Sequence, residues 1–206
     1  MIGVIDYGRG NLLSVTNALD SIGEDVTLVR NPDELSQCDR IVLPGVGAFP
    51  AGMRSLIESE LIGALTDNVI NQGKPFLGIC LGMQLLTKVG HEMIDTDGLG
   101  WIDGEVLEMK PSEPNLKLPH VGWNETAPDP NSPLFKNLGK TPVFYYVHSY
   151  AVSLSGQNTT AEAWCDYGGK FVAAVRNQNI VATQFHPEKS QEIGLRFLTN
   201  WVDWNP

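Results

Sequence analysis

The chain has 206 residues, of which 42% are hydrophobic and 18% are charged, and its formal net charge is −10. This composition excludes a disordered or fibrous chain, and the length suffices for one sizeable core, so we expect a single domain over residues 1–206. The acidic balance disfavours a nucleic-acid partner, because a phosphate backbone attracts clustered lysine and arginine side chains.

The first half of the chain alternates short apolar runs with helical patterns. The apolar runs predict buried strands, and the 3.6-residue periodicity between them predicts helices. The predicted strands are residues 2–6, 25–29, 40–44 and 75–79, and the predicted helices are residues 12–22 and 53–70. Strands that alternate with helices in this way indicate an α/β fold, with a parallel sheet covered on both faces.

The second half reads mostly as strands. The predicted strands are residues 101–109, 117–123, 142–152 and 161–165, followed by a hairpin of residues 170–175 and 179–185. An amphipathic helix over residues 190–203, with Ser190 as its N-cap, closes the chain. We therefore predict a mostly parallel central sheet flanked by helices, with additional antiparallel strands in the second half.

The cysteine spacing and the length of the apolar runs indicate in which cellular compartment the protein is expected. Cys38, Cys80 and Cys165 are widely and irregularly spaced, which indicates neither a disulfide framework nor a zinc site. No segment approaches the roughly 18 apolar residues of a membrane span, and the first residues show no signal-peptide pattern. We expect a cytoplasmic protein without a membrane partner.

One cysteine lies between two glycines where a predicted strand gives way to a helical pattern, in the sequence PFLGICLGMQLL of residues 75–86. The glycines would let the chain turn sharply, so that the side chain of Cys80 projects from the bend. Unpaired N–H groups and the helix dipole at such a position favour thiolate over thiol. Cys80 is thus a candidate nucleophile, whereas Cys38 and Cys165 are interpreted as small core residues.

The best candidate for a base is His186 in the sequence QFHPEKS. Pro187 disfavours helix at the preceding residue, so His186 should be extended. Residues two apart in an extended chain face the same way, and Glu188 could therefore orient the imidazole. When the motif is taken alone, an ordinary turn at a strand end is the favoured explanation of His-Pro-Glu. Together with Cys80, the three residues fit a nucleophile–base–carboxylate triad.

A glycine pair supplies candidate donors for an oxyanion. Gly45 and Gly47 flank Val46 after a predicted strand, and they leave its peptide free to turn an N–H toward a developing negative charge. The N–H of Leu81, directly after the candidate nucleophile, is a second candidate donor. Taken alone, these glycines fit an ordinary loop between a strand and a helix, and their spacing matches neither a dinucleotide-binding nor a Walker motif.

The motifs GICLGMQ and QFHPE resemble the two signatures of class I, triad-type glutamine amidotransferases, which have a flavodoxin-like α/β fold. Within that family, DYGRGNL, PGVGAF, PHVGWN, VHSY and FHPEKS resemble the glutaminase subunits of imidazole glycerol phosphate synthases. The resemblance runs from Met1 to about Trp201, with the motifs in matching order. It implies no metal and no organic cofactor.

The resemblance also implies roles for individual residues. Cys80 would attack the side-chain amide of glutamine, His186 would protonate the departing ammonia, and Glu188 would hold His186. Gly47 and Leu81 would serve the oxyanion. The residues that would hold the amino-acid portion of glutamine are Gln84, Ser149 and Tyr150.

A partner follows from the same resemblance. Similar proteins pass ammonia to a (βα)8-barrel synthase subunit, which makes imidazole glycerol phosphate and an aminoimidazole carboxamide ribotide in histidine biosynthesis. Asn11, Trp123 and Lys189 are candidates for the contact surface, although each also fits an ordinary loop or surface position. We expect the isolated subunit to be nearly idle, with the peptide at Val46 as the switch.

Two other functions stay open. A paralogous glutaminase could supply ammonia for the amidation of a bacterial surface sugar, with unchanged chemistry at Cys80. Alternatively, a cysteine hydrolase with another substrate, or a binding module without activity, could use the same fold. The intact set of Cys80, His186 and Glu188 disfavours the binding module, and the motifs PHVGWN and VHSY disfavour the unrelated hydrolase.

Overall fold

The computed structural model describes residues 1–156 and 158–206. In the first half, the elements are β1 (Ile2–Ile5), α1 (Leu12–Ser21), β2 (Val26–Val29), α2 (Pro32–Leu35), β3 (Arg40–Gly45), α3 (Phe49–Glu58), α4 (Ile62–Thr66), a π-helical turn (Asp67–Asn71), β4 (Phe76–Cys80) and α5 (Leu81–Gln84). The second half contains β5 (Val89–Gly90), β6 (Thr96–Asp97), β7 (Gly104–Glu108), β8 (His120–Pro128), a 3₁₀ turn (Pro133–Phe135), β9 (Val143–His148), β10 (Tyr150–Leu154), β11 (Thr160–Asp166), β12 (Lys170–Asn177), β13 (Ile180–Thr183), a second 3₁₀ turn (Pro187–Lys189) and α6 (Gln191–Asp203).

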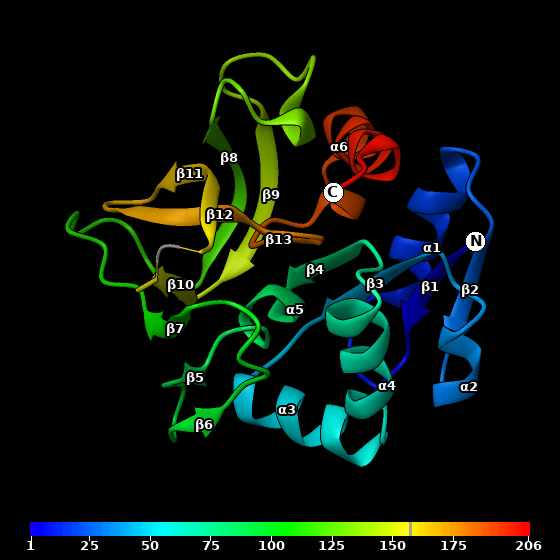
Figure 1. Ribbon diagram of the computed structural model, residues 1–206. Helices are drawn as coiled ribbons and strands as arrows, with labels where there is room; N and C mark the ends of the chain where they lie inside the picture. Colours follow the sequence, from blue (N-terminus) through cyan, green and yellow to red (C-terminus); the bar gives the residue numbers. More distant parts are fainter. Residues whose placement is uncertain (157) are drawn as a thin grey trace.

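Among the described residues, nine strands form one sheet in the order β2-β1-β3-β4-β13-β12-β11-β8-β9 (Figure 1). The first five pair in parallel, and pairing is antiparallel from β13 to β9. A smaller sheet has the order β10-β7-β5-β6. The predicted α/β fold, with a mostly parallel first half and added antiparallel strands, is confirmed.

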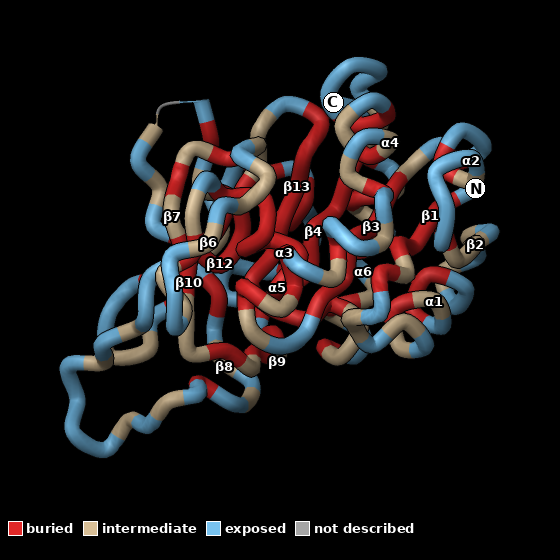
Figure 2. Tube along the Cα trace, turned by 90° about the horizontal axis from the view of Figure 1, so that it is seen from below, coloured by how far each residue is buried: buried red, intermediate tan, exposed pale blue. Residues whose placement is uncertain are grey.

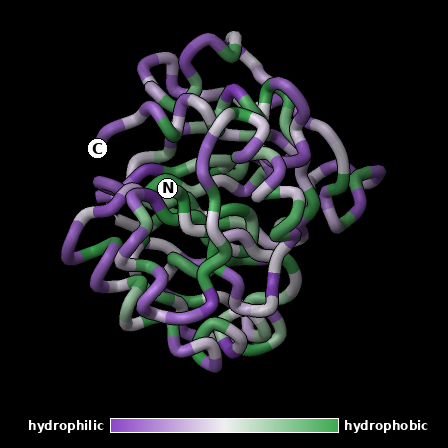
Figure 3. The backbone as a smooth tube through the Cα atoms, turned by 90° about the vertical axis from the view of Figure 1, so that its right-hand side faces the viewer, coloured by the Kyte–Doolittle hydropathy of each residue, from purple (hydrophilic) through white to green (hydrophobic). Residues whose placement is uncertain are grey.

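Helices cover both faces of the parallel strands. Along β3, Val42 belongs to the apolar cluster beneath α1 and α6, whereas Ile41 and Leu43 belong to the cluster beneath α2, α3 and α4. This alternation follows from the two-residue period of a strand, and it explains why these strands read as continuous apolar runs. Figure 2 shows the strands as a buried centre surrounded by exposed loops, and in Figure 3 the hydrophobic segments concentrate in the interior.

Three expectations about elements are wrong. The single helix expected over residues 53–70 begins earlier, at Phe49, and is interrupted after Glu58, because Glu60 adopts a left-handed φ of 58°. The strand expected over residues 142–152 is two strands, since β9 pairs with β8 in the large sheet and β10 pairs with β7 in the small one.

The third wrong expectation is the cap of α6. The hydroxyl of Ser190 makes no cap hydrogen bond and instead donates to the carbonyl of His186 at 2.6 Å. The same oxygen accepts from the N–H of Tyr145 at 2.9 Å. Ser190 therefore fixes the chain after His186 against β9. Within the described residues, no helix has both the length and the apolar character that crossing a membrane would take.

Candidate active site

The turn between β4 and α5 holds Cys80 in a strained backbone conformation. Its φ of 56° and ψ of −109° lie where a residue with a side chain is rarely found, at a cost of about 1–3 kcal/mol. The parallel pairing of β3 with β4 puts Gly45 level with Cys80. The loop after β3 and the turn after β4 therefore meet at the carboxyl edge of the sheet, where ligands bind in open α/β folds.

Glycine is required on both sides of this turn. A Cβ atom at Gly82 would overlap the carbonyl oxygen of Leu43 in β3, and a Cβ atom at Gly78 would lie 2.9 Å from the carbonyl oxygen of Gly82. The first turn of α5 therefore packs directly on the neighbouring strands, and a methyl group at either position would push it outward. This close approach keeps the sulfur of Cys80 at the strand end.

His186 and Glu188 form a buried pair next to Cys80. The Nδ1 atom of His186 lies 2.7 Å from Oε1 of Glu188, and the two side chains are 2% and 1% exposed. An antiparallel bridge to Tyr145 holds the backbone of His186 extended, as Pro187 predicts. Nε2 of His186 has no hydrogen-bond partner among the described residues, which leaves this nitrogen available for proton transfer.

The charges around His186 decide its protonation. Burial lowers the pKa of the imidazole, but the charge of Cys80 and the hydrogen bond and charge of Glu188 outweigh burial and raise the pKa to about 10. His186 is therefore cationic near neutral pH. A cationic imidazole beside a cysteine and a carboxylate can stabilise a thiolate and later donate its proton to a leaving group.

The candidate nucleophile and base share one cavity of about 270 Å³. It is lined by Val46, Gly47, Cys80, Leu81, Gln84, Glu92, Pro119, Val147, His148, Ser149, Tyr150 and His186. All of the predicted oxyanion and substrate residues therefore lie around the same space as the nucleophile. Glu188 lies behind His186, as expected for a residue that orients the base.

The oxyanion loop has the backbone freedom that its glycines predict. Gly47 has a φ of 103°, which a residue with a side chain rarely adopts. Gly45 packs so closely against Leu81 that a Cβ atom there would lie 2.9 Å from the Cβ of Leu81. The peptide at Val46 consequently lies beside the first turn of α5, where its N–H and that of Leu81 can approach one anion.

Tyr150 and Gln84 form the wall on the other side. The side-chain nitrogen of Gln84 donates to the backbone carbonyl of Tyr150 at 2.9 Å, although Gln84 belongs to the parallel half and Tyr150 to the small sheet. Ser149 lies at the junction where the chain leaves the large sheet for the small one. These contacts place polar groups where they can recognise the charged end of an amino acid.

Three buried or half-buried residues at this site were missed by the sequence analysis. The carboxylate of Glu92 lines the cavity and accepts from the N–H of Phe49 at 2.7 Å, at the start of α3. Gln184 donates to the sulfur of Cys80 at 3.6 Å. Burial, together with the charge of Cys80, raises the pKa of Tyr7, which packs against Gly45. The position of Gln184 two residues before His186 could have indicated that it lies at this site. No local pattern indicates Glu92 or Tyr7.

The three candidates for a partner surface lie in different settings. Trp123 is 58% exposed, and its ring lies 5.0 Å from that of Tyr145 in an edge arrangement. The ammonium of Lys189 lies 5.7 Å from the centre of the same ring. Asn11 caps α1 by accepting from the N–H of Ser14. The structure thus brings Trp123 and Lys189 together on Tyr145 and keeps Asn11 in a structural role at a helix start.

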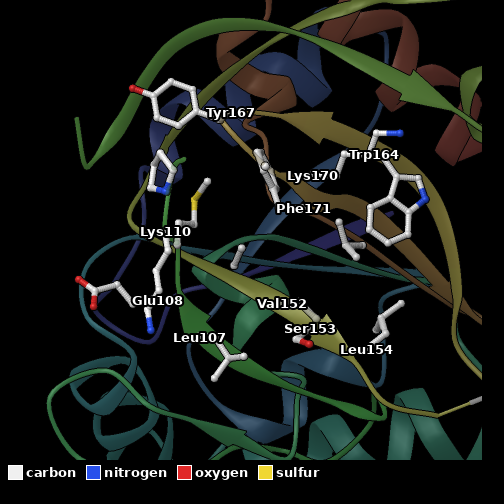
Figure 4. A pocket seen from close by; sticks show the side chains of 15 residues that line it. Leu107, Glu108, Lys110, Val152, Ser153, Leu154, Trp164, Tyr167, Lys170 and Phe171 are labelled. Carbon is white, nitrogen blue, oxygen red and sulfur yellow. The ribbon is translucent and has the colours of Figure 1, made fainter. Parts of the chain in front are cut away.

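A second cavity, of about 350 Å³, lies away from these residues (Figure 4). Leu107, Val152 and Leu154 lie on one side of it and Trp164 and Phe171 on the other, between the small sheet and the β11–β12 hairpin. None of the predicted site residues lines it. Among the described residues, no cluster of three or more histidine, cysteine or acidic side chains is arranged to hold a metal ion.

The family profile of class-I glutamine amidotransferases matches residues 3–203 of this chain. The chain belongs to that family. This amidotransferase is 46% identical over 209 residues to the imidazole glycerol phosphate synthase subunit HisH of Zymomonas mobilis. The matched region covers 100% of this chain and 96% of that protein. It is 45% identical over 202 residues to the subunit HisH 1 of Campylobacter jejuni, with coverage of 98% and 99%.

Solved structures agree with the fold of the amidotransferase. PurLQS of Thermotoga maritima has a TM-score of 0.76 at 18% identity, with 98% of this chain and 97% of that chain covered. A glutamine amidotransferase of the same organism has a TM-score of 0.67 at 16% identity, with coverage of 98% and 82%. The predicted family is thereby confirmed by the profile and the relatives, and the fold class by these structures.

Proposed function

We propose that this protein is the glutaminase subunit of an imidazole glycerol phosphate synthase. It hydrolyses glutamine to glutamate and ammonia and passes the ammonia to a (βα)8-barrel synthase subunit in histidine biosynthesis. The observation that carries the proposal is the buried pair of His186 and Glu188 at 2.7 Å, beside Cys80 and a common cavity. The full-length similarity to HisH subunits supports this acceptor over a surface sugar.

The polar groups of the cavity define how glutamine binds. The carboxylate of Glu92 and the side-chain oxygen of Gln84 face the α-ammonium group of the substrate, because both lie on the cavity wall and both are acceptors. Ser149 and Tyr150 hold the remaining amino-acid portion. The side-chain amide then reaches Cys80, with its oxygen between the N–H groups of Leu81 and the peptide at Val46 and Gly47.

The reaction proceeds through a thioester. The thiolate of Cys80 attacks the amide carbon, and the oxyanion forms against the backbone N–H groups. His186 donates its proton to the nitrogen as the carbon–nitrogen bond breaks, and ammonia leaves. Water then attacks the thioester while Nε2 of His186 accepts a proton, and glutamate and the free thiol are released. Glu188 holds the ring in place throughout and stabilises the imidazole whenever it is cationic.

The partner is proposed to bind over the mouth of the cavity. Val121 and Trp123 project from β8 with 57% and 58% exposure, and Val46 is 38% exposed at the cavity rim. Exposed apolar side chains around a polar cavity are typical of a surface that a second protein covers. We assign Asn11 and Lys189 to the same surface. The three unpaired cysteines fit a reducing compartment, and we place the protein in the cytoplasm.

A labelling experiment with an activity arm tests the function. The purified subunit is treated with a diazo-ketone analogue of glutamine, and we expect modification of Cys80 alone, because reactivity follows thiolate character and access. Glutamine turnover is then measured with and without the barrel synthase and its acceptor, and we expect the complex to be at least about 100-fold faster, the size of one missing oxyanion donor.

Two outcomes would contradict the proposal. Labelling of Cys38 or Cys165 with Cys80 untouched would exclude Cys80 as the nucleophile. Activation only by a synthase that amidates a surface sugar would assign the protein to the other pathway. Full turnover by the isolated subunit would leave the glutaminase in place and reject the switch at Val46.

A further inference from the structure

A chain of hydrogen bonds leads from the cavity wall to the nucleophile through two buried glutamines. Nε2 of Gln84 donates to the carbonyl of Tyr150 at 2.9 Å and to Oε1 of Gln184 at 3.0 Å. Nε2 of Gln184 then donates to the sulfur of Cys80 at 3.6 Å. Gln84 is 5% exposed and Gln184 is 0% exposed, so these bonds form in a water-poor interior, where their directions matter most.

The direction of this chain is fixed at its first member. A backbone carbonyl such as that of Tyr150 can only accept, so Gln84 must present its NH₂ group there. The second hydrogen of that group leaves Gln184 only the role of acceptor at its oxygen. Consequently the NH₂ group of Gln184 must face Cys80. Turning either amide around would bring two donors or two acceptors together.

The segment directly after β13 carries both the candidate base and Gln184. Parallel pairing of β13 with β4 sets Thr183 level with Ile79, so that Gln184 comes level with Cys80. Gln184 and His186 both approach Cys80, since Gln184 donates to its sulfur and the charge of Cys80 raises the pKa of His186. Phe185 between them points into the core, where its ring stacks on Phe144 with centres 3.9 Å apart.

We propose that Gln184 is a further catalytic residue, which donates a hydrogen bond to the sulfur of Cys80 and ties that bond to substrate recognition at Gln84. The proposal rests on the glutaminase function proposed above. A thiolate gains more from an N–H donor than a neutral thiol does, because hydrogen bonds to a charged group are the stronger ones. Gln184 therefore favours the thiolate form of Cys80, which is the nucleophile.

Substrate binding strengthens this bond. Gln84 uses its nitrogen within the chain, and its oxygen is left to accept from the α-ammonium of glutamine. An amide that accepts at its oxygen becomes a better donor at its nitrogen, and the polarisation passes to the next amide in the chain. The charged end of the correct substrate thus raises the donor strength of Gln184 toward Cys80, and a ligand without an α-amino group does not.

The first test needs no glutamine. Iodoacetamide labelling of Cys80 is followed against pH by peptide mass spectrometry in the wild type, Gln184→Glu and Gln184→Met, with Gln37→Met at an exposed turn as the matched control. Both Gln184 variants should label about 10- to 100-fold more slowly at neutral pH, since one hydrogen bond to a charged group is lost. The pH of half-maximal labelling should rise, most in Gln184→Glu because its carboxylate repels the thiolate.

A second variant keeps the test decisive if the Gln184 substitutions disturb folding, which thermal unfolding reports. Gln84→Met leaves Gln184 in place and removes the partner that orients it, and labelling should slow by about fivefold, the effect of one neutral hydrogen bond. Wild-type labelling rates in folded Gln184→Glu, or in Gln84→Met, would overturn the proposal.

The second test measures the coupling to substrate. Turnover of glutamine is compared with that of its analogue lacking the α-amino group, in the complete synthase complex, for the wild type and Gln184→Glu. For each protein, kcat with glutamine is divided by kcat with the analogue. We expect this ratio to be about fivefold larger in the wild type than in Gln184→Glu. Equal ratios would overturn the coupling. The two proposals can fail separately. If the wild type turns over no glutamine but the variants are still labelled more slowly, the contact of Gln184 with Cys80 stands and the glutaminase function is wrong.

Discussion

Two buried histidine sites next to the same cavity differ in protonation, since one imidazole is cationic near neutral pH and the other is neutral. At the first, His186 lies beside Cys80 and Glu188, and its pKa rises to about 10. At the second, His148 donates from Nδ1 to the carbonyl of Tyr150 at 2.8 Å and lies 3.4 Å from the ring nitrogen of His120. Burial lowers the pKa of His148 to about 3, and the charges of His120 and His186 add to the effect.

The difference shows that burial alone does not make a catalytic base. Both histidines are almost fully enclosed, yet only His186 has a carboxylate within hydrogen-bond distance. Without such a partner, desolvation keeps an imidazole neutral, and its nitrogens serve as an ordinary donor and acceptor. His148 therefore holds the carbonyl of Tyr150 in place, whereas His186 has the charge and the free Nε2 that the proposed proton transfer requires.

The largest expected effect separates the two sites directly. His186→Asn should lower kcat for glutamine by roughly a thousandfold or more, as loss of a triad base does elsewhere. His148→Asn should lower kcat/KM by only about fivefold, because one hydrogen bond to Tyr150 is lost or lengthened. Steady-state assays of the complete complex give both values, and circular dichroism checks the fold.

Two outcomes would contradict this contrast between the histidines: effects of the two variants in the reverse order, and equal effects of both. Near-normal turnover in His186→Asn, together with a collapse in His148→Asn, would make His148 the base. Equal collapse in both, with folded protein, would mean that the position of Tyr150 matters as much as proton transfer.

Removal of the carboxylate of Glu188 should make His186 resemble His148, with a lowered pKa. In Glu188→Gln the burial of His186 is no longer offset by Glu188, so we expect the pKa of the imidazole to fall and a smaller fraction of His186 to carry the proton that the leaving group needs. The catalytic rate should drop by about 100-fold, within the range of general acid–base catalysis, and the alkaline limb of the pH profile should move to lower pH. Glu192→Gln, an exposed position on α6, is the matched control.

A wild-type rate together with an unchanged pH profile in Glu188→Gln would show that Cys80 alone sets the protonation of His186. A lower rate with an unmoved profile would restrict Glu188 to orienting the ring. Either result would change the reason for the contrast between the two histidine sites.

Much of the first site could be predicted from the sequence, because its chemistry is local. The glycines around Cys80 and the spacing of His186 and Glu188 follow from short-range rules for turns and extended chain. The same holds for the parallel strands, which read as apolar runs. Gln184 lies in the same short motif as His186, and two-residue spacing would have placed it on the same side.

The second site could not be predicted in this way. His120 and His148 are brought together by the pairing of β8 with β9, and no local spacing relates residues 28 positions apart. Ser149 joins strands of two different sheets, and a continuous apolar run conceals that break. Glu92 contacts the N–H of Phe49 only because the β5–β6 segment folds against α3. Tertiary packing rather than propensity decides each case.

The smallest expected effect concerns stability against acid. Burial lowers the pKa of His120 to about 4, so the folded state resists protonation there while the unfolded chain binds a proton near pH 6.5. Stability from this group is therefore complete above about pH 6.5 and is lost as pH falls toward 4. His91 has the opposite sign, because hydrogen bonds to Asp95 and Glu105 raise its pKa, and its contribution grows as pH falls.

Urea unfolding at pH 7 and pH 5 tests this sign. His120→Gln should lose less stability between the two pH values than the wild type, with a limiting slope of about 1.4 kcal/mol per pH unit for one group. His91→Gln should lose slightly more than the wild type over the same interval. Comparing the change with pH removes the cost of repacking, which both pH values share. A steeper loss in His120→Gln would mean that His120 is protonated in the fold, and the contrast between the two buried sites would no longer hold.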